Sequence, residues 1–458
     1  MTLPVAGRPG LPKALRLRDL ILLKVAAILN ISLVPLVAGF GLASLALWVL
    51  AFLAFLVPEM VAVVALARRY PGEGGVYLWA RRQFGEAHGF LSGWCYWTNN
   101  LFYVPMQLVY IAGVAAYASE APADLLAEKW FVSLVAFGCL GVMTIANIRG
   151  LGVGKWVQNA GAVGAALTAG LVVLAGGRAL SAGAGPPPAI AGSGWEMLSG
   201  FSVMCFAFVG IELASTMGDE IEAPERNLPR AVVAAGVITL VGYVAVTASL
   251  VVLVPPEDIG AVQGVMQAIV AGAERTGTTW LVAPLAILLA IAIAGGASAW
   301  FAGSARVPFV AGLDRALPAS LGRVHHRWRS PHVALLVSAI VSAGFVGLAL
   351  AGSTVAEAYQ VLLRAAVVIQ LVPFLYLFAG LMRLEAAPPW ARVAGLVGLA
   401  TSAFGIVTAF IPPSEGTSVL VFELKMLAGV VVPVGVGWML FRRAGRQAGA
   451  ASTSAATR

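Results

Sequence analysis

Long apolar segments alternate with short polar connections along most of this chain. About twelve of the segments have 18 or more residues, which is enough for a helix to cross about 30 Å of hydrocarbon. None shows the strict alternation of apolar and polar residues that is typical of a strand in a membrane β-barrel. The pattern therefore predicts an all-α polytopic membrane protein. The expected spans are residues 20–40, 42–67, 87–118, 130–148, 155–176, 199–221, 230–254, 279–312, 332–351, 355–381, 390–411 and 418–441.

The composition supports a membrane location and a single transmembrane domain. Of the 458 residues, 60% are hydrophobic and only 11% are charged, whereas soluble domains carry about 25% charged residues. No connection is rich enough in proline, glycine or serine to separate soluble domains. We therefore expect one transmembrane domain at residues 20–441, preceded by a cytoplasmic segment at 1–19. The small polar residues at 442–458 predict a disordered cytoplasmic tail.

The net charge of +8 is distributed unequally between the two sides of the predicted membrane. Basic residues gather in every alternate connection, and this positive-inside pattern predicts that both termini lie in the cytoplasm. It explains the basic excess without a nucleic-acid partner and indicates a multi-pass protein of the cytoplasmic (inner) membrane. The connections assigned to the cytoplasm contain Arg16, Arg18, Arg68, Arg69, Arg81, Arg82, Arg149, Lys155, Arg226, Arg230, Arg323, Arg327, Arg329, Arg442 and Arg443, and the opposite ones only Lys129, Arg178 and Arg275.

The sequence does not contain the motifs expected of an enzyme or a metal site. Cys95, Cys139 and Cys205 lie inside apolar segments, as small core residues do, and the 4 histidines lie near the predicted cytoplasmic face. Neither H-E-x-x-H nor G-x-S-x-G occurs. We therefore expect no metal, no cofactor and no enzymatic activity. A scaffold would need a soluble or coiled segment, and a passive channel would lack paired interruptions in its helices.

Two of the expected spans contain residues that interrupt a helix. Residues 29–35 read Leu-Asn-Ile-Ser-Leu-Val-Pro; proline removes a helical hydrogen bond, and Asn30 and Ser32 compete for the backbone. In span six, Gly210 precedes Glu212 at mid-depth, where a charged side chain costs roughly 2.5–3.5 kcal/mol. One explanation is a glutamate that faces a water-filled cavity where the backbone opens. The other is a protonated glutamate in an interhelical hydrogen bond.

Interruptions in spans one and six occupy corresponding positions in two five-helix halves. Such pairs indicate an inverted five-plus-five repeat with a central binding site. We expect repeat one at residues 20–176, repeat two at 199–381 and two further helices at 390–441. An unwound helix exposes N–H groups that attract a carboxylate and C=O groups that attract an ammonium. Two facing breaks therefore favour a zwitterion such as an amino acid over a sugar or a simple ion.

Several motifs, in order along the chain, resemble those of the amino acid–polyamine–organocation (APC) superfamily of secondary transporters. Residues 208–212 read Phe-Val-Gly-Ile-Glu, and residues 219–231 read Asp-Glu-Ile-Glu-Ala-Pro-Glu-Arg-Asn-Leu-Pro-Arg-Ala. They resemble the family signature F-x-G-x-E followed by E-x-x-x-P-x-R-x-[IL]-P-x-A. Residues 71–77 match its P-x-x-G-G-x-Y motif, and residues 313–318 match its x-D-x-x-[LF]-P motif. The resemblance covers nearly the whole chain.

This resemblance implies a leucine-transporter-like fold with broken helices 1 and 6, alternating access and an amino-acid-like substrate. Phe206 matches an aromatic residue that covers the substrate in the arginine/agmatine exchanger branch. Glu212 matches the gate glutamate of that branch, and Trp300 matches one of its tryptophans. Core packing is the competing role for Phe206 and Trp300. The candidate substrate-binding residues are Asn30, Ile31, Ser32, Asn100, Phe206, Phe208, Gly210, Glu212 and Trp300.

Three positions depart from the family pattern. Asn30-Ile31-Ser32-Leu33 replaces the usual G-S-G-[IV] of span one, and Gly164 stands where several relatives carry a lysine in span five. Exchange and proton coupling through Glu212 both remain open as a result. Arg364 lies well inside span ten, so it either faces the substrate path and pairs with Glu212 or an acidic substrate, or reaches the external interface.

The sequence thus predicts a secondary active transporter that moves amino acids across the cytoplasmic membrane by alternating access. It would work as an exchanger or a proton-coupled symporter, with Glu212 and Arg364 as candidate gating or coupling residues. The alternative is a polyamine or organic amine carrier, in which Glu212 pairs with a substrate amine. The expected partners are a small-molecule substrate and the lipid bilayer, and the expected assembly is a monomer or homodimer.

Overall fold

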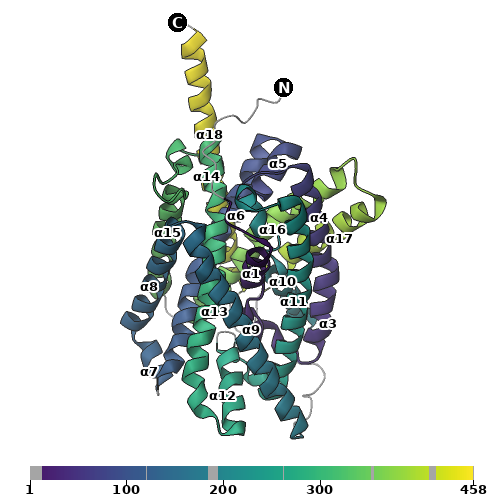
Figure 1. The fold of residues 1–458 in the computed structure, drawn as a ribbon, viewed down its shortest axis with the longest axis vertical. Coiled ribbons are helices and arrows are strands. Elements are labelled where there is room, and N and C mark those ends of the chain that lie inside the picture. Colours follow the sequence, from purple (N-terminus) through teal and green to yellow (C-terminus); the bar gives the residue numbers. More distant parts are fainter. Residues whose placement is uncertain are drawn as a thin grey trace.

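The expected all-α, multi-pass architecture is confirmed. A computed structural model describes residues 13–119, 121–183, 194–260, 263–351, 355–411 and 419–456. Within these residues, helices form the whole fold, and the only β pairing is an isolated bridge between Leu15 and Ile221. Ten helices in the same part of the chain are long and apolar enough to cross a membrane. Figure 1 shows them packed side by side into one elongated bundle.

The helices follow the predicted spans closely and add short elements between them. The α-helices are α1 (Leu17–Ile28), α2 (Pro35–Ala38), α3 (Ala43–Ala51), α4 (Val57–Arg69), α5 (Val76–Phe84), α6 (Glu86–Ala115), α7 (Pro122–Ala127), α8 (Lys129–Ile148), α9 (Leu151–Ser181), α10 (Gly194–Phe208), α11 (Pro224–Leu253), α12 (Gly264–Thr276), α13 (Val282–Ser304), α14 (Arg306–Leu313), α15 (His332–Ala351), α16 (Val355–Arg383), α17 (Pro389–Thr408) and α18 (Val419–Ala456). The short helical turns are η1 (Ile31–Leu33), η2 (Phe52–Leu56), η3 (Ala116–Ala118), η4 (Leu213–Glu220), η5 (Pro256–Asp258), η6 (Thr279–Leu281) and η7 (Ala319–Gly322).

Two expected spans are not among the ten long apolar helices, for different reasons. The span expected at residues 20–40 is divided between α1, η1 and α2, because the helix stops before Asn30. The span expected at 332–351 corresponds to α15, whose apolar described part is His332–Gly347. The twelve-span count, the inverted repeat and the disordered tail stay predictions; α18 itself continues to Ala456.

Close helix packing builds the centre of the bundle. α13 packs along α9, where Gly161 and Gly295 face each other. A Cβ atom added at Gly161 would lie 2.4 Å from the Cα atom of Gly295. Only glycine at both positions lets the two backbones approach this closely, as small residues do between membrane helices. The contact holds α13, which carries Trp300, firmly in the centre of the bundle.

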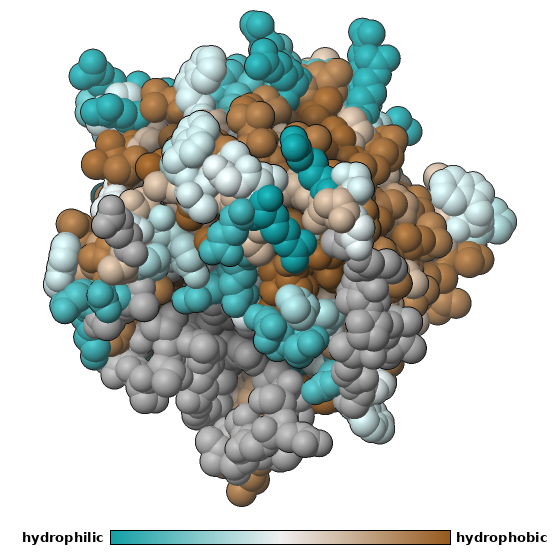
Figure 2. All heavy atoms as spheres, turned by 90° about the horizontal axis from the view of Figure 1, so that it is seen from below, coloured by the Kyte–Doolittle hydropathy of each residue, from teal (hydrophilic) through white to brown (hydrophobic). Residues whose placement is uncertain are grey.

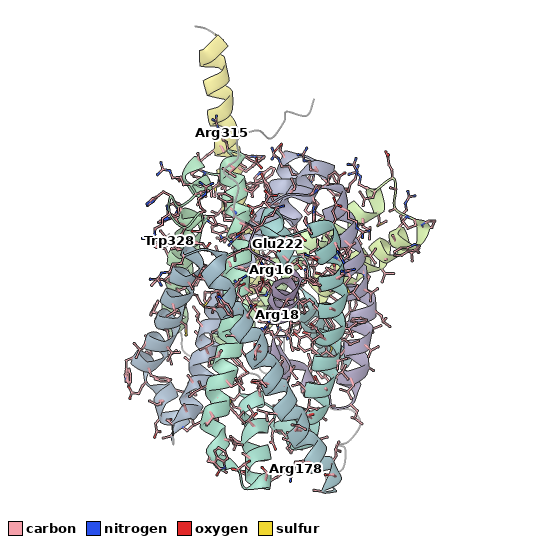
Figure 3. The ribbon with its side chains drawn as sticks, in the orientation of Figure 1. Arg16, Arg18, Arg178, Glu222, Arg315 and Trp328 are labelled. Atoms are coloured by element: carbon pink, nitrogen blue, oxygen red, sulfur yellow. The ribbon has the colours of Figure 1, made fainter. Side chains whose placement is uncertain are left out.

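The two ends of the bundle differ in charge. One end holds α5 and the α14–α15 connection with Arg315, whereas Arg178 lies at the other end (Figures 1 and 3). We name the first the basic end, because α5 and that connection carry Arg81, Arg82, Arg315 and Arg323. Seen from the opposite end, hydrophobic residues cover much of the coloured surface, and hydrophilic residues lie both near the middle of the face and along parts of its edge (Figure 2).

Backbone and side-chain contacts close the basic end around the two interrupted spans. The N–H of Ala14 donates to the carbonyl of Glu220 at 2.9 Å, next to the Leu15–Ile221 bridge. Arg306 pairs with Glu220 at 3.0 Å, and both side chains are buried. Arg16 and Glu222 form an exposed ion pair at 3.4 Å (Figure 3). These contacts fasten the start of α1 to the end of η4, so the two broken spans meet at this end.

Candidate functional site

The first interrupted span breaks at Asn30. The backbone N–H of Asn30 donates to the carbonyl of Ile28 at 2.6 Å, which ends the regular pattern of α1. The side-chain oxygen of Asn30 then accepts from the backbone N–H of Ser32 at 3.2 Å and from its hydroxyl at 2.6 Å. The amide nitrogen of Asn30 donates to the hydroxyl of Tyr103 at 2.7 Å. The break predicted from sequence is therefore present, and Asn30 caps the turn that follows it.

The second interrupted span breaks at Gly210. α10 ends at Phe208, and Gly210 has φ 135°, a backbone conformation that residues with a Cβ atom rarely adopt. The N–H of Gly210 turns inward and donates to Glu212 Oε2 at 2.8 Å. η4 then continues toward the basic end with a different hydrogen-bond pattern. Glycine suits this position because the break between α10 and η4 requires a positive φ.

Two aromatic side chains join the breaks to each other. The hydroxyl of Tyr243 on α11 accepts from the N–H of Asn30 at 3.1 Å and lies against the carbonyls of Ile28 and Ala207. Trp300 on α13 donates from its indole nitrogen to the carbonyl of Ala27 at 2.9 Å. These side chains satisfy backbone groups that the end of a helix leaves free. They therefore fix the two broken spans against α11 and α13.

A small cavity of about 10 Å³ lies between the two breaks. Its volume admits roughly one water molecule, so the site has to widen before it admits an organic solute. Aromatic rings and amide groups share its wall with backbone. The lining residues are Ala27, Asn30, Leu33, Asn99, Tyr103, Phe206, Ala207, Val209 and Trp300. The structure thus brings the predicted residues Asn30, Phe206 and Trp300 together around one cavity.

Glu212 lies beside this cavity without lining it. The side chain is fully buried, and Oε1 accepts from the hydroxyl of Tyr96 at 2.8 Å while Oε2 accepts from the N–H of Gly210. Tyr96 and Tyr103 on α6 both lie 5.9 Å from the ring centroid of Trp300. Glu212 is therefore coupled to the cavity wall through Tyr96 and Trp300.

Several other predicted site residues lie away from the cavity wall. Phe208 turns toward Trp48 and Tyr243, with ring centroids 5.4 and 5.5 Å away. Asn100 donates to the carbonyl of Tyr96 within its own helix at 3.0 Å. Its neighbour Asn99 lines the cavity instead, because one residue along a helix rotates a side chain by about 100°. Ser32 acts within the capped turn, and Ile31 lines a second cavity of about 10 Å³ on the far side of Asn30.

Arg364 does not pair with Glu212. Its guanidinium donates to the hydroxyl of Ser199 and to the carbonyl of Ile411, the latter at 2.8 Å, and stacks over Phe422 at 5.9 Å. Ser199 lies on α10 well before the break at Gly210. Ser199 and Phe208 lie nine positions apart on the helix, which corresponds to roughly 14 Å. Arg364 therefore fastens α16 to α10 and to the residues that follow α17, near the end of the bundle opposite the basic end.

A larger cavity of about 370 Å³ opens at the basic end. It reaches Ser215, three residues beyond Glu212, and its wall includes Arg68 and Asp219. In the described part of the chain, no group of three histidine, cysteine, aspartate or glutamate side chains has a metal-binding arrangement. The amide and hydroxyl groups around the first break lie beside aromatic rings, and such groups can recognise an organic solute by hydrogen bonds and aromatic contacts.

The sequence contained signals for residues that our site prediction missed. Tyr96, Asn99, Tyr103 and Gln107 recur at helical spacing along α6, so they share one face of an otherwise apolar helix. This polar stripe points at the first break, where Tyr103 contacts Asn30. Lys24 and Glu59 are ionisable residues inside apolar segments, and such residues are functional candidates by default. Tyr243 has no comparable signal, because isolated tyrosines are common in membrane helices.

Comparisons with known proteins find transporters among the relatives of this chain. An uncharacterized transporter of Legionella pneumophila is 24% identical over 454 residues, which cover 94% of this chain and 97% of that relative. The low-affinity putrescine importer PlaP of Escherichia coli is 30% identical over 293 residues, covering 60% of this chain and 61% of the importer. The probable agmatine/putrescine antiporter AguD of Lactococcus lactis is 23% identical over 277 residues, covering 58% of this chain and 57% of that antiporter.

A family model described as amino acid permease matches residues 20–432, nearly the whole chain. This match and the transporter relatives confirm the resemblance to the APC superfamily that the motifs predicted. The chain is a multi-pass membrane transporter, and it belongs to the amino acid permease family.

Proposed function

We propose that this protein is a secondary active transporter of amino acids in the cytoplasmic membrane. The observation that carries the proposal is the cavity between the breaks at Asn30 and Gly210, with Phe206 and Trp300 in its wall. The substrate would enter this cavity when the aromatic wall moves apart. It would leave on the other side after the broken spans rearrange at their turns, as alternating access requires.

Each part of the site has a defined role in this proposal. Phe206 forms the lid together with Tyr103, whose ring centroid is 6.1 Å from that of Phe206. Glu212 acts as the gate, because it links Tyr96 on α6 to the turn at Gly210. The basic end would face the cytoplasm by the positive-inside rule, and the cavity of about 370 Å³ at that end would be the inner vestibule.

A carrier of polyamines or other organic amines is the second candidate, and one observation favours it. The N–H groups of Ser32 and Gly210, which would hold a substrate carboxylate, already donate to Asn30 and Glu212. A substrate with a carboxylate has to displace these bonds, whereas an amine does not. Aromatic rings such as those of Phe206 and Trp300 also attract ammonium groups.

Counterflow in proteoliposomes separates the two candidates. The panel consists of amino acids and the amines formed by their decarboxylation: arginine and agmatine, ornithine and putrescine, lysine and cadaverine. Each pair differs only in the carboxylate. An amino acid transporter exchanges the first member of a pair faster, and an amine carrier exchanges the second. If neither member of any pair exchanges and alanine, leucine and glutamate also fail, the proposed function is wrong.

Removing the ring of Phe206, the proposed lid, should change the KM of the exchanged solute specifically. Phe206→Leu keeps an apolar side chain but removes the ring that packs against Tyr103. We expect the KM of the exchanged solute to rise by up to about tenfold, since the lost aromatic contact is worth about 0.5–1.5 kcal/mol. Phe201→Leu, on the same helix but packed against Phe404, is the matched control and should leave KM unchanged.

A further inference from the structure

Three ionisable side chains meet behind the second break. The proposed transport function does not use them together. Lys24 comes from α1, Glu59 from α4 and Glu212 from the turn after Gly210. All three are fully buried, with 0% of each residue exposed. They therefore connect both interrupted spans to a third helix through charged groups that have no access to solvent.

The contacts define how the three groups share their charges. The ammonium of Lys24 donates to the carbonyl of Ile211 in the second break and interacts electrostatically with both carboxyl groups. The carboxyl group of Glu59 interacts electrostatically with that of Glu212 and with the ammonium of Lys24. Neither carboxyl oxygen of Glu59 has a hydrogen-bond partner among the described residues.

Two buried carboxyl groups close enough to interact favour a proton on one of them. Ionised carboxylates are acceptors only, so two of them side by side repel. With Lys24 charged and both carboxyl groups ionised, the cluster has a net charge of −1 in a site that excludes water. An unbalanced buried charge costs several kcal/mol. One proton on the carboxyl pair removes both the repulsion and the excess charge.

Neighbouring groups do not supply this charge balance. Tyr96 on α6 faces the pair and donates its hydroxyl proton to Glu212, but a neutral tyrosine adds no charge. Among the other buried ions described, Glu220 and Arg306 pair with each other, and Arg364 is bound to Ser199 and Ile411. The charge of Glu59 is therefore balanced only through Glu212 and Lys24.

We propose that Glu59 and Glu212 form a proton-binding site that holds one transferable proton, with Lys24 as its fixed counter-ion. The proton binds to a carboxylate oxygen of the pair and leaves from the same oxygen to water when the basic end opens. Because Lys24 is bound to the carbonyl of Ile211, opening the second break changes the distance between the ammonium and both acids. Proton binding and the movement of the broken spans are therefore coupled.

Charge neutrality predicts a definite number of protonated carboxyl groups for each variant. The native cluster holds one protonated carboxyl group. Glu59→Gln leaves the neutral pair Lys24–Glu212 and should hold none, and Glu212→Gln should likewise hold none. Lys24→Met removes the cation and should hold two. Lys24→Gln should also hold two, although its amide still donates to the Ile211 carbonyl, because the charge and not the hydrogen bond sets the number of protons.

Infrared difference spectra of the purified full chain at neutral pH measure these numbers. The signal is the carbonyl stretch of protonated carboxyl groups, identified by its shift in D₂O. We expect the native intensity to disappear in Glu59→Gln and to double in Lys24→Met and Lys24→Gln. Glu423→Gln, which changes an exposed glutamate on α18, is the matched control and should give no difference.

The proposal is wrong if Glu59→Gln and Glu212→Gln leave the carboxyl signal unchanged, or if both lysine variants do. Four variants report on the same number of protonated carboxyl groups, so the proposal can still be tested if one of them does not fold. The role in coupling rests on the proposed transport function, and it has a separate readout. Glu59→Gln should retain counterflow of the solute found with the panel but lose its accumulation under a pH gradient. The infrared result does not depend on transport, so failure of the proton-binding proposal can be distinguished from failure of the proposed transport function.

Discussion

Replacing Gly210 by alanine is expected to abolish transport and to lower the free energy of unfolding by at least about 2 kcal/mol. Gly210 has φ 135°, and a Cβ atom there would lie 3.0 Å from Ile28 Cγ1 and 3.2 Å from Trp300 Cζ2. The added methyl group thus strains the backbone and presses the second break away from the first. The N–H of Gly210 would turn away from Glu212, which then loses one of its two hydrogen bonds.

Counterflow and thermal unfolding in detergent measure the two effects of this substitution. Gly170→Ala on α9 is the matched control, because no atom lies within 4 Å of the position where its Cβ would be placed. Alanine is the better helix former by roughly 1 kcal/mol, so the control should be as stable as the native protein or more stable. Native transport in Gly210→Ala would show that the break is not needed.

Replacing Tyr243 by phenylalanine is the second large effect that we expect. The change removes a single oxygen, which contacts the N–H of Asn30 and the carbonyls of Ile28 and Ala207. A buried polar group left without a partner costs about 1–3 kcal/mol. The N–H of Asn30 and the carbonyl of Ile28 still bond each other, so the carbonyl of Ala207 is the group that loses its hydroxyl partner. The free energy of unfolding should therefore fall by about 1–3 kcal/mol.

Transport should suffer in the same variant, because Tyr243 fixes both breaks at once. We expect the rate of counterflow to fall by more than about tenfold, which corresponds to about 1.4 kcal/mol in the barrier. Tyr376→Phe removes a hydroxyl that contacts only His88 in the described structure, and it should change stability by less than about 0.5 kcal/mol. Equal behaviour of the two variants would mean that the hydroxyl of Tyr243 does not hold the breaks.

The sequence predicted the spans well, because a helix in lipid needs a long apolar segment and little else. It also located both breaks, since proline, glycine and capping residues act on the local backbone. Asn30 caps the turn and Gly210 has a positive φ, and both facts follow from residue type. α5 and α12 were not expected, because short amphipathic helices in the connections lack the apolar length on which the prediction rested.

The site was harder to predict, because it depends on which side chains from distant helices face each other. Phe206 and Phe208 are two residues apart on α10, and only Phe206 reaches the cavity. Asn99 and Asn100 differ by one residue, and Asn99 lines the cavity whereas Asn100 bonds to the carbonyl of Tyr96 within its own helix. Lys24 and Glu59 interact with Glu212 only through the packing of α1 and α4 around the break. Residue type and spacing do not predict that packing.

Substrate protection of a single cysteine tests the central claim, that the substrate binds between the two breaks. Asn99 lines the cavity, so Asn99→Cys is made in a chain whose three native cysteines are replaced by alanine. A small cationic methanethiosulfonate reagent then labels it with and without the solute that exchanges in counterflow. We predict that labelling slows by about tenfold at a solute concentration about ten times its Kd. Ser320→Cys, exposed on η7, should label at the same rate throughout. Unchanged labelling of Asn99→Cys at saturating solute would contradict the claim.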